Sequence, residues 1–191
     1  MRKIKELFIS SSKELKNLRC LTLIGMFCAI SIVIGSFSIM LSEDIKISFT
    51  FLPNEFVYYL FGPVVGVIFG AVTDLLTFII SPKGPFFFGF TLSGMLTGLL
   101  YGVLLYKKPL SLVRVFLVNA IWMILIGILL NTYWLSILNG VNYFVLLSTR
   151  VPKELIMLPI NTFLLYTVIK GVESTKILEL LHNKIAKTKI N

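Results

Sequence analysis

The composition of the chain places it in a membrane. The chain has 191 residues, 57% of them hydrophobic, and a mean hydropathy of +0.91, far above that of soluble domains of this length. A formal net charge of +9 would suggest nucleic acid as the partner of a soluble protein, but the positive-inside rule explains it here, so we expect no nucleic-acid binding. Two cysteines and one histidine, His182, are too few for a metal cluster or a disulfide framework, so no metal or cofactor is predicted.

The N-terminal segment, residues 1–19, is basic, with six Lys and Arg residues against two Glu. The loosely helical spacing of its apolar residues fits an interfacial helix, and a solvated positive flank fits equally well. The apolar run over residues 20–41 is too long for the core of a cleavable signal peptide, and no A-x-A-like site follows it. We therefore predict a first transmembrane helix over residues 18–41. Its pair Gly25-x-x-x-Ala29 permits the close approach of another helix, either inside the bundle or from a docking subunit.

Residues 42–52 alternate apolar side chains with Lys46 and other polar residues, which predicts an extended external loop after the first helix. Pro53 then opens a helix near its first turn, where proline is tolerated. The tripeptide Phe61-Gly62-Pro63 is predicted to split the apolar run 54–80 into two helices, because proline disfavours a helical residue before it. Asp74 lies near the middle of the second helix, where a carboxylate either lines a cavity or bonds to another helix.

From residue 81 onward, the sequence predicts a loop followed by three more helices. Residues 81–90, SPKGPFFFGF, contain four aromatic residues that either stack on a flat ligand or form an aromatic belt at the membrane interface. Helices are predicted over residues 91–106, 115–132 and 151–170, with a polar-aromatic connection at 134–149. The result is an all-α membrane protein, a six-transmembrane-helix bundle over residues 20–172, with cytoplasmic basic segments at 1–19 and 173–191.

The distribution of basic residues predicts the orientation of this bundle. With the N-terminus in the cytoplasm, the inner segments 1–19, 107–114 and 170–191 hold six, three and five basic residues, or 14 of the 18. The C-terminus is then cytoplasmic as well. Lys46, Lys83, Arg150 and Lys153 lie on the outer face, which brings three unusual connections together and predicts one external pocket.

The motifs that are missing argue against an enzyme. No G-x-x-x-x-G-K-[ST], H-E-x-x-H or G-x-S-x-G motif occurs, and the Asp/Glu/His chains of a proton-coupled pump are missing too. The residues that remain suit binding. Arg150 can hold a carboxylate through two parallel hydrogen bonds, and Lys153 adds a point charge. Because the two residues are three positions apart, they lie on the same helical face if the last helix has begun by Arg150, with Pro152 in the first turn of that helix. Snorkelling of both cations at a helix end is the alternative.

Three segments carry a family resemblance: LFGPVVG at 60–66 with DLL at 74–76, GFTLS at 89–93, and NTYWLSIL at 131–138 followed by TR at 149–150 and LIMLP at 155–159. Together with the six short predicted helices and the basic cytoplasmic ends of the chain, these segments resemble the substrate-binding S components of energy-coupling factor (ECF) vitamin transporters. Within that group they resemble the folate-specific members. Two positions depart from the family pattern: Phe88 stands where proline is usual, and Gly94 where alanine is frequent.

The resemblance implies a multi-pass subunit of the bacterial cell membrane that binds a vitamin from outside, with folate as the favoured ligand. A transmembrane coupling subunit and two ATPase subunits would supply the energy for transport. The first helix would dock on the coupling subunit through Gly25 and Ala29. An S component for another vitamin, or a non-transporting membrane protein or enzyme, is the alternative. The candidate ligand-binding residues are Arg150, Lys153, Asn131, Trp134, Asp74, Phe90, Thr91, Lys46 and Phe88.

Overall fold

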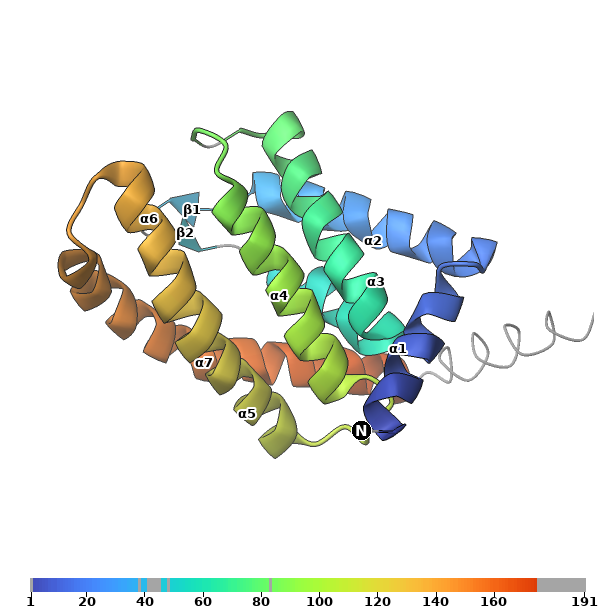
Figure 1. Cartoon of the computed structure of the whole chain (residues 1–191). Coiled ribbons are helices and arrows are strands. Elements are labelled where there is room, and N and C mark those ends of the chain that lie inside the picture. Colours follow the sequence, from blue (N-terminus) through green and yellow to red (C-terminus); the bar gives the residue numbers. More distant parts are fainter. Residues whose placement is uncertain (1, 38, 41–45, 48, 83, 175–191) are drawn as a thin grey trace, which may run out of the picture.

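The fold is a helical bundle with one short strand pair (Figure 1). The computed structural model describes residues 2–37, 39–40, 46–47, 49–82 and 84–174, without the side chains of 2–3, 39–40 and 46–47. Its elements are α1 (Arg2–Glu14), α2 (Leu18–Ser36), β1 (Ile39–Met40), β2 (Lys46–Ile47), α3 (Phe51–Ile80), α4 (Phe88–Leu105), α5 (Leu112–Trp122), the π-helix η1 (Met123–Leu130), α6 (Asn131–Asn139) and α7 (Tyr143–Ser174).

Among the described residues, five helical segments are long and apolar enough to cross a membrane: α2, α3, α4, the continuous helix Leu112–Asn139, and α7. The prediction of a multi-pass helical membrane protein is therefore confirmed at this level. The predicted number of six transmembrane helices counts α3 as two. Its first part, up to Phe61, is only about 16 Å long at 1.5 Å per residue, shorter than a bilayer core.

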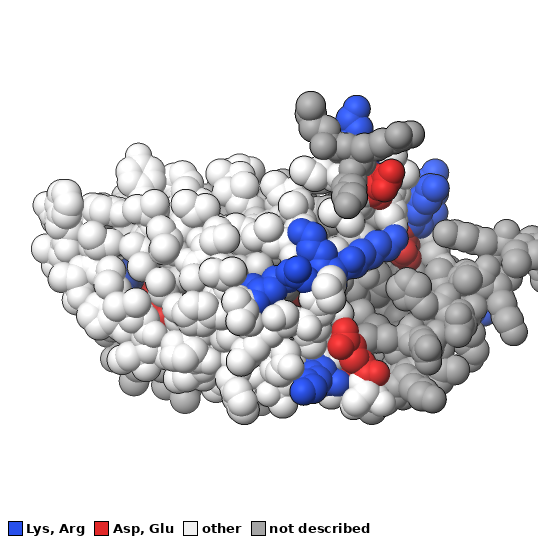
Figure 2. Space-filling model, turned by 90° about the horizontal axis from the view of Figure 1, so that it is seen from below, with Lys and Arg blue, Asp and Glu red and all other residues white. Residues whose placement is uncertain are grey.

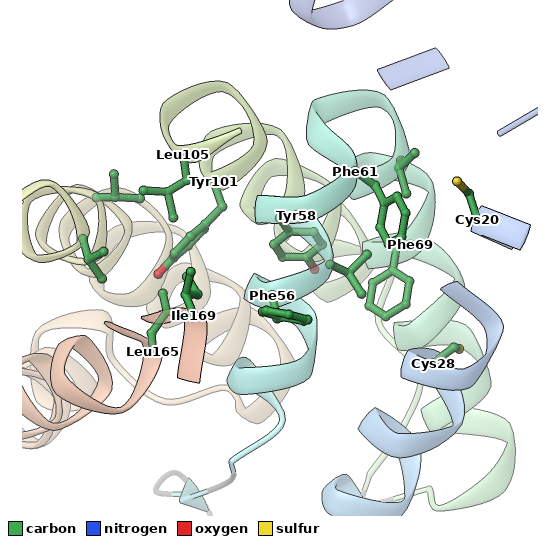
Figure 3. Close-up of a cluster of buried hydrophobic side chains, with 14 of the residues drawn as sticks. Cys20, Cys28, Phe56, Tyr58, Phe61, Phe69, Tyr101, Leu105, Leu165 and Ile169 are labelled. Carbon is green, nitrogen blue, oxygen red and sulfur yellow. The ribbon is translucent and has the colours of Figure 1, made fainter. Parts of the chain in front are cut away.

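The helix α3 consists of two arms that fold back on each other at Gly62. This glycine adopts φ +83° and ψ −168°, outside the helical region, and Pro63 follows it, so the break predicted at Phe61-Gly62-Pro63 is present. The rings of Tyr58 and Phe69 lie on opposite sides of the break, yet their centroids are 6.0 Å apart in an edge-to-face arrangement (Figure 3). Eleven residues of straight helix would separate them by about 16 Å.

The helix α1 packs on this break and supplies its hydrogen bonds. The buried hydroxyl of Ser11 donates to the carbonyl oxygen of Phe61 (2.6 Å) and accepts from the N–H groups of Val64 (3.0 Å) and Val65 (3.2 Å). Ser11 is fully buried at the break, so water does not reach these groups and a neighbouring side chain must satisfy them. Of the two interpretations of residues 1–19, the structure shows a helix.

The second arm of α3 and the helix α4 approach each other through four glycines. A methyl group added at Gly66 or Gly70 would overlap the backbone of Gly98 or Gly94, respectively, and the reverse additions would also crowd the opposite backbone. Small residues at a helix interface let two backbones pack closely within lipid. This seam fixes the relative position of the two helices that carry Asp74 and Thr91.

The last third of the chain differs from the prediction. Residues 134–139 continue the helix α6, Gly140 then turns with φ +65°, and α7 already begins at Tyr143 instead of near 151. The predicted connection at 134–149 is therefore wrong, and Pro152 lies inside a helix rather than in its first turn. Helical backbone satisfies its own hydrogen bonds, which a membrane environment requires even where side chains are polar. The helix α2 also ends earlier than predicted, at Ser36.

The segment after α2 contains a short antiparallel strand pair, in which Ile39 faces Ile47 and Met40 faces Lys46. Lys46 and Ile47 are extended, as predicted for residues 42–52, whereas Ile39 and Met40 were predicted to be helical and residues 51–52 already belong to α3. Residues 41–45 and 48 lie outside the described part of the chain. In Figure 1 the α3–α4 and α6–α7 connections lie at one end of the bundle. The start of α1 and the α4–α5 connection lie at the other end, which we call the basic end after Lys107, Lys108 and Arg114 of that connection and the start of α5.

Candidate functional site

A cavity of about 360 Å³ lies among α3, α4, the Leu112–Asn139 helix and α7. Its volume falls in the range of small-molecule sites, about 300–1,000 Å³. The fold-back at Gly62 brings both arms of α3 to it, Asn54 and Glu55 from the first arm and Thr73 and Asp74 from the second. Most side chains around the cavity are polar, in a bundle whose outer surface is largely apolar.

Asp74 and Thr91 join two walls of the cavity. The Thr91 hydroxyl donates to Oδ2 of Asp74 at 2.6 Å, which links the second arm of α3 to the first turn of α4. Thr91 is buried behind this bond, whereas Asp74 lines the cavity together with Phe90. Asp74 therefore does both things proposed for it from the sequence: it bonds to another helix and it lines a cavity.

The wall formed by α7 carries a charged cluster of Arg150, Lys153 and Glu154. Oε1 of Glu154 lies 2.9 Å from Nζ of Lys153 and 3.9 Å from Nη2 of Arg150, and the same Nη2 donates to the carbonyl oxygen of Gly127 at 3.4 Å. Lys153 and Glu154 line the cavity, whereas Arg150 lies next to them without lining it. Arg150 is only 8% exposed, so it does not snorkel to the surface. Two cations share one carboxylate, so the cluster keeps a net positive charge.

The helix following η1 places Asn131 and Trp134 on the third side. Asn131 lines the cavity, and the Trp134 indole donates to the hydroxyl of Ser93 at 3.2 Å, with Ser93 itself lining the cavity. Gly89 makes room for the indole, since a methyl group there would lie 2.6 Å from the Trp134 ring. Trp134 thus supports the wall that Ser93 forms.

After Arg150, Thr91 and Trp134, which lie behind the lining residues, Phe88 and Lys46 are the two predicted residues that remain. Phe88 is 66% exposed and does not line it. The side chain of Lys46 lies outside the described part of the chain, although its backbone belongs to β2.

Sequence reasoning did not assign Asn54, Glu55, Trp122 and Asn161 to the site, although all four line the cavity. The signal was present for Glu55, one of two charges in the long apolar run 54–80, and for Asn161, an amide inside the apolar run 155–169. Trp122 gave no such signal, because its role depends on a contact with α4, where its indole donates to the Thr97 hydroxyl at 2.9 Å.

Three polar atoms of cavity-lining residues are buried without a hydrogen-bond partner in the described part of the chain: Oε2 of Glu55, Oδ1 of Asn131 and Oδ1 of Asn161. Leaving such an atom unsatisfied costs about 1–3 kcal/mol. All three are acceptors that lie just beneath the cavity surface, so a ligand with several N–H or O–H donors would satisfy them after a small side-chain rotation. The cavity therefore suits a polar molecule that also carries an anionic group for Lys153.

The predicted docking residues Gly25 and Ala29 lie far along the chain from these groups, on α2. Both are exposed and line a separate apolar groove of about 420 Å³ between α2 and the second arm of α3. A methyl group at Gly25 would meet no atom within 4 Å, so packing inside this chain does not explain the glycine.

Comparison with known proteins agrees with this arrangement. Residues 19–169 match the family described as ECF transporter, substrate-specific component. The chain is 36% identical over 173 residues to the folate transporter FolT of Clostridium novyi (strain NT), covering 91% of this chain and 98% of that protein. It is 26% identical over 154 residues to the folate transporter FolT of Leuconostoc mesenteroides, covering 78% and 83%.

A solved structure has the same fold. The crystal structure of FolT bound with folic acid superposes with a TM-score of 0.75 at 34% identity, covering 80% of this chain and 93% of that chain. The family match over most of the chain and the relative matched along nearly its whole length lead to one conclusion: this chain belongs to the family of substrate-specific components of ECF transporters.

Proposed function

We propose that this protein binds folate with high affinity as the substrate-specific component of an ECF importer. The observation that carries the proposal is the cavity, in which unsatisfied acceptors of Glu55, Asn131 and Asn161 accompany the cation Lys153. Folate combines a flat heterocycle rich in N–H donors with a tail that bears carboxylates. The relatives named as folate transporters support this ligand over other vitamins.

The arrangement of charges suggests how folate would lie. We infer that Asp74 and the unsatisfied acceptors face the heterocycle, because paired N–H donors suit carboxylate and amide oxygens. Phe90 would stack on a ring, and Lys153 would meet a carboxylate, with Arg150 strengthening its field from behind. Thr91 and Trp134 act as positioning residues through Asp74 and Ser93. Lys46 and Phe88 stay candidates for the mouth of the pocket.

We further infer a six-pass protein of the bacterial cell membrane, with the binding domain over residues 20–172 and both flanking segments in the cytoplasm. The fold-back of α3 supports the sixth pass, because it returns the chain to the end from which that helix began. The apolar groove beside Gly25 and Ala29 would receive a helix of the membrane coupling subunit, and two ATPase subunits would drive transport. The chain itself would bind substrate without catalysing a reaction.

Isothermal titration of the purified chain with folate and a panel of other vitamins tests the substrate. We expect tight folate binding, and Lys153→Gln is expected to weaken it about tenfold or more, because a hydrogen bond to a charged group contributes about 1.5–3 kcal/mol. Lys170→Gln removes the same charge at an exposed site of the same helix and should leave affinity unchanged.

The identity of the substrate and the location of its binding site are tested separately. Binding of another vitamin instead of folate would contradict the substrate and leave the family assignment in place. Unchanged folate affinity in Lys153→Gln would show that the ligand does not use this cavity wall.

A further inference from the structure

A second, apolar groove of about 640 Å³ runs between α4 and η1 and shares no lining residue with the ligand cavity. Its walls include Leu96, Leu100 and Val103 of α4, Leu125 of η1, and Ile4 and Phe8 of α1. All of its lining side chains are apolar. Because the groove lies between membrane-spanning helices, hydrocarbon rather than water is its favourable filling.

The groove follows α4 from near its C-terminal end toward the middle of the bundle. Val103 and Leu96 are seven residues apart, or about 10 Å along the helix axis. The helix α1 closes the basic end of the groove, since Ile4 and Phe8 lie one turn apart on one face of α1. This shape suits an elongated acyl chain that enters beside α1 and lies along α4.

Basic side chains stand at the same end. The ammonium group of Lys108 donates to the carbonyl oxygen of Val103 at 2.9 Å, which places the cation at a groove-lining residue. Lys107 is held beside it by a hydrogen bond to Ser10 of α1 and by the ring of Tyr106, whose centroid lies 5.2 Å from Nζ. Residues 106–114 contain no Asp or Glu.

The face of the molecule at this end shows the charge directly. In Figure 2 several Lys and Arg side chains form a band across the face, with Asp and Glu side chains beside one end of the band and an uncharged surface at the other end. With Lys5 and Glu6 of α1 included, the charges of Lys5, Glu6, Lys107, Lys108 and Arg114 sum to +3. Basic sites between membrane helices bind the headgroups of anionic lipids.

We propose that this groove is a binding site for an anionic phospholipid, whose acyl chain lies between α4 and η1 and whose headgroup phosphate is held at Lys108. The groove is apolar along its whole length and, among the residues that the structure describes, has cations without an acidic partner at one end. This combination matches an acyl chain with an anionic headgroup better than it matches a protein helix. The site belongs to the chain itself and does not depend on which vitamin the cavity holds.

Native mass spectrometry of the full chain in detergent tests the proposal with phosphatidylglycerol and phosphatidylcholine of identical acyl chains. We expect phosphatidylglycerol to be retained several-fold more than phosphatidylcholine. Lys108→Gln should reduce that preference about fivefold, because one basic residue near an anionic headgroup contributes on that scale. Lys16→Gln removes the same charge from an exposed residue away from the groove and should leave the preference unchanged.

A groove-filling variant separates the site from general surface charge. Leu100→Trp should reduce retention of both lipids, while Ile79→Trp, at an exposed residue outside the groove, should not. Leu96→Trp, at a half-exposed position of the same groove, repeats the test if Leu100→Trp does not fold. Equal retention of the two lipids by the parent chain, equal effects of Lys108→Gln and Lys16→Gln, or full retention in the folded Trp variants would each overturn the proposal.

Discussion

Ser11 shows how one residue can hold a membrane helix break together. Its side chain is completely buried, and it makes three hydrogen bonds to backbone groups at the bend of α3. Ser11→Ala leaves the carbonyl oxygen of Phe61 and two N–H groups without this partner, at a cost of about 1–3 kcal/mol. We expect a thermal unfolding midpoint several degrees below that of the parent chain, measured in detergent.

The neighbouring serine provides the control for this prediction. Ser12 is exposed and donates only to the carbonyl oxygen of Ile9 in its own helix, at 2.9 Å. Ser12→Ala should therefore shift the midpoint little. Equal midpoints for the two variants would show that Ser11 does not stabilise the bend.

The roles of some residues can be predicted from their sequence context, whereas the roles of others depend on a partner that is distant in the sequence. Asp74 and Lys153 stood out as charges in or beside apolar runs, and both line the cavity. Ser11 did not stand out, because a serine in a polar segment is ordinary until the fold places a broken helix 50 residues away beside it. Asn54 is similar, since its Oδ1 accepts from the hydroxyl of Ser31 on α2 at 2.7 Å.

At the scale of elements, the glycine seam between α3 and α4 is predicted to determine both stability and binding. Gly98→Ala adds a methyl group that overlaps the backbone of Gly66, so the two helices must move apart. This displacement separates Asp74 from Thr91, and we expect a lower thermal unfolding midpoint together with weaker folate binding.

Gly171→Ala is the matched control, because this glycine also lies in a helix, α7, but has no atom within 4 Å of the added methyl group. Alanine favours helix over glycine by about 1 kcal/mol, so this variant should be neutral or slightly more stable. A Gly98→Ala chain with the parent's midpoint and affinity would contradict the role of the seam.

Element boundaries were predictable where backbone chemistry decides them. Gly62-Pro63 breaks α3 as its sequence indicates, because the proline disfavours a helical residue before it and the glycine at that position adopts a positive φ. Residues 134–149 were wrongly predicted to be a non-helical connection, because their polar and aromatic residues lack the uniform apolarity of a membrane helix. Hydrogen bonding of the backbone favours helix there regardless of side-chain polarity, and the helix is interrupted only at residues 140–142, where Gly140 turns with a positive φ.

At the scale of the whole molecule, the two ends of the bundle differ in charge and in content. The basic end holds α1, the bend of α3 and the α4–α5 connection, whereas the α3–α4 and α6–α7 connections lie at the opposite end (Figure 1). By the positive-inside rule we expect the basic end to face the cytoplasm and the opposite end to face the outside, where a vitamin would arrive. Composition and charge spacing predict this orientation without the structure, whereas the shape of the cavity depends on the fold-back of α3.

Labelling of single introduced cysteines with a membrane-impermeant maleimide on intact cells tests this topology. Pro85→Cys, at an exposed position in the α3–α4 connection, should react on intact cells, whereas Ser111→Cys and Lys16→Cys, exposed at the basic end, should react only after permeabilisation. The parent chain controls for background, because Cys20 and Cys28 are both buried. The reverse pattern would place the basic end outside and contradict uptake from the outer face. Reaction of both ends on intact cells would mean that the chain inserts in both orientations, and the charge bias would then be too weak to orient it.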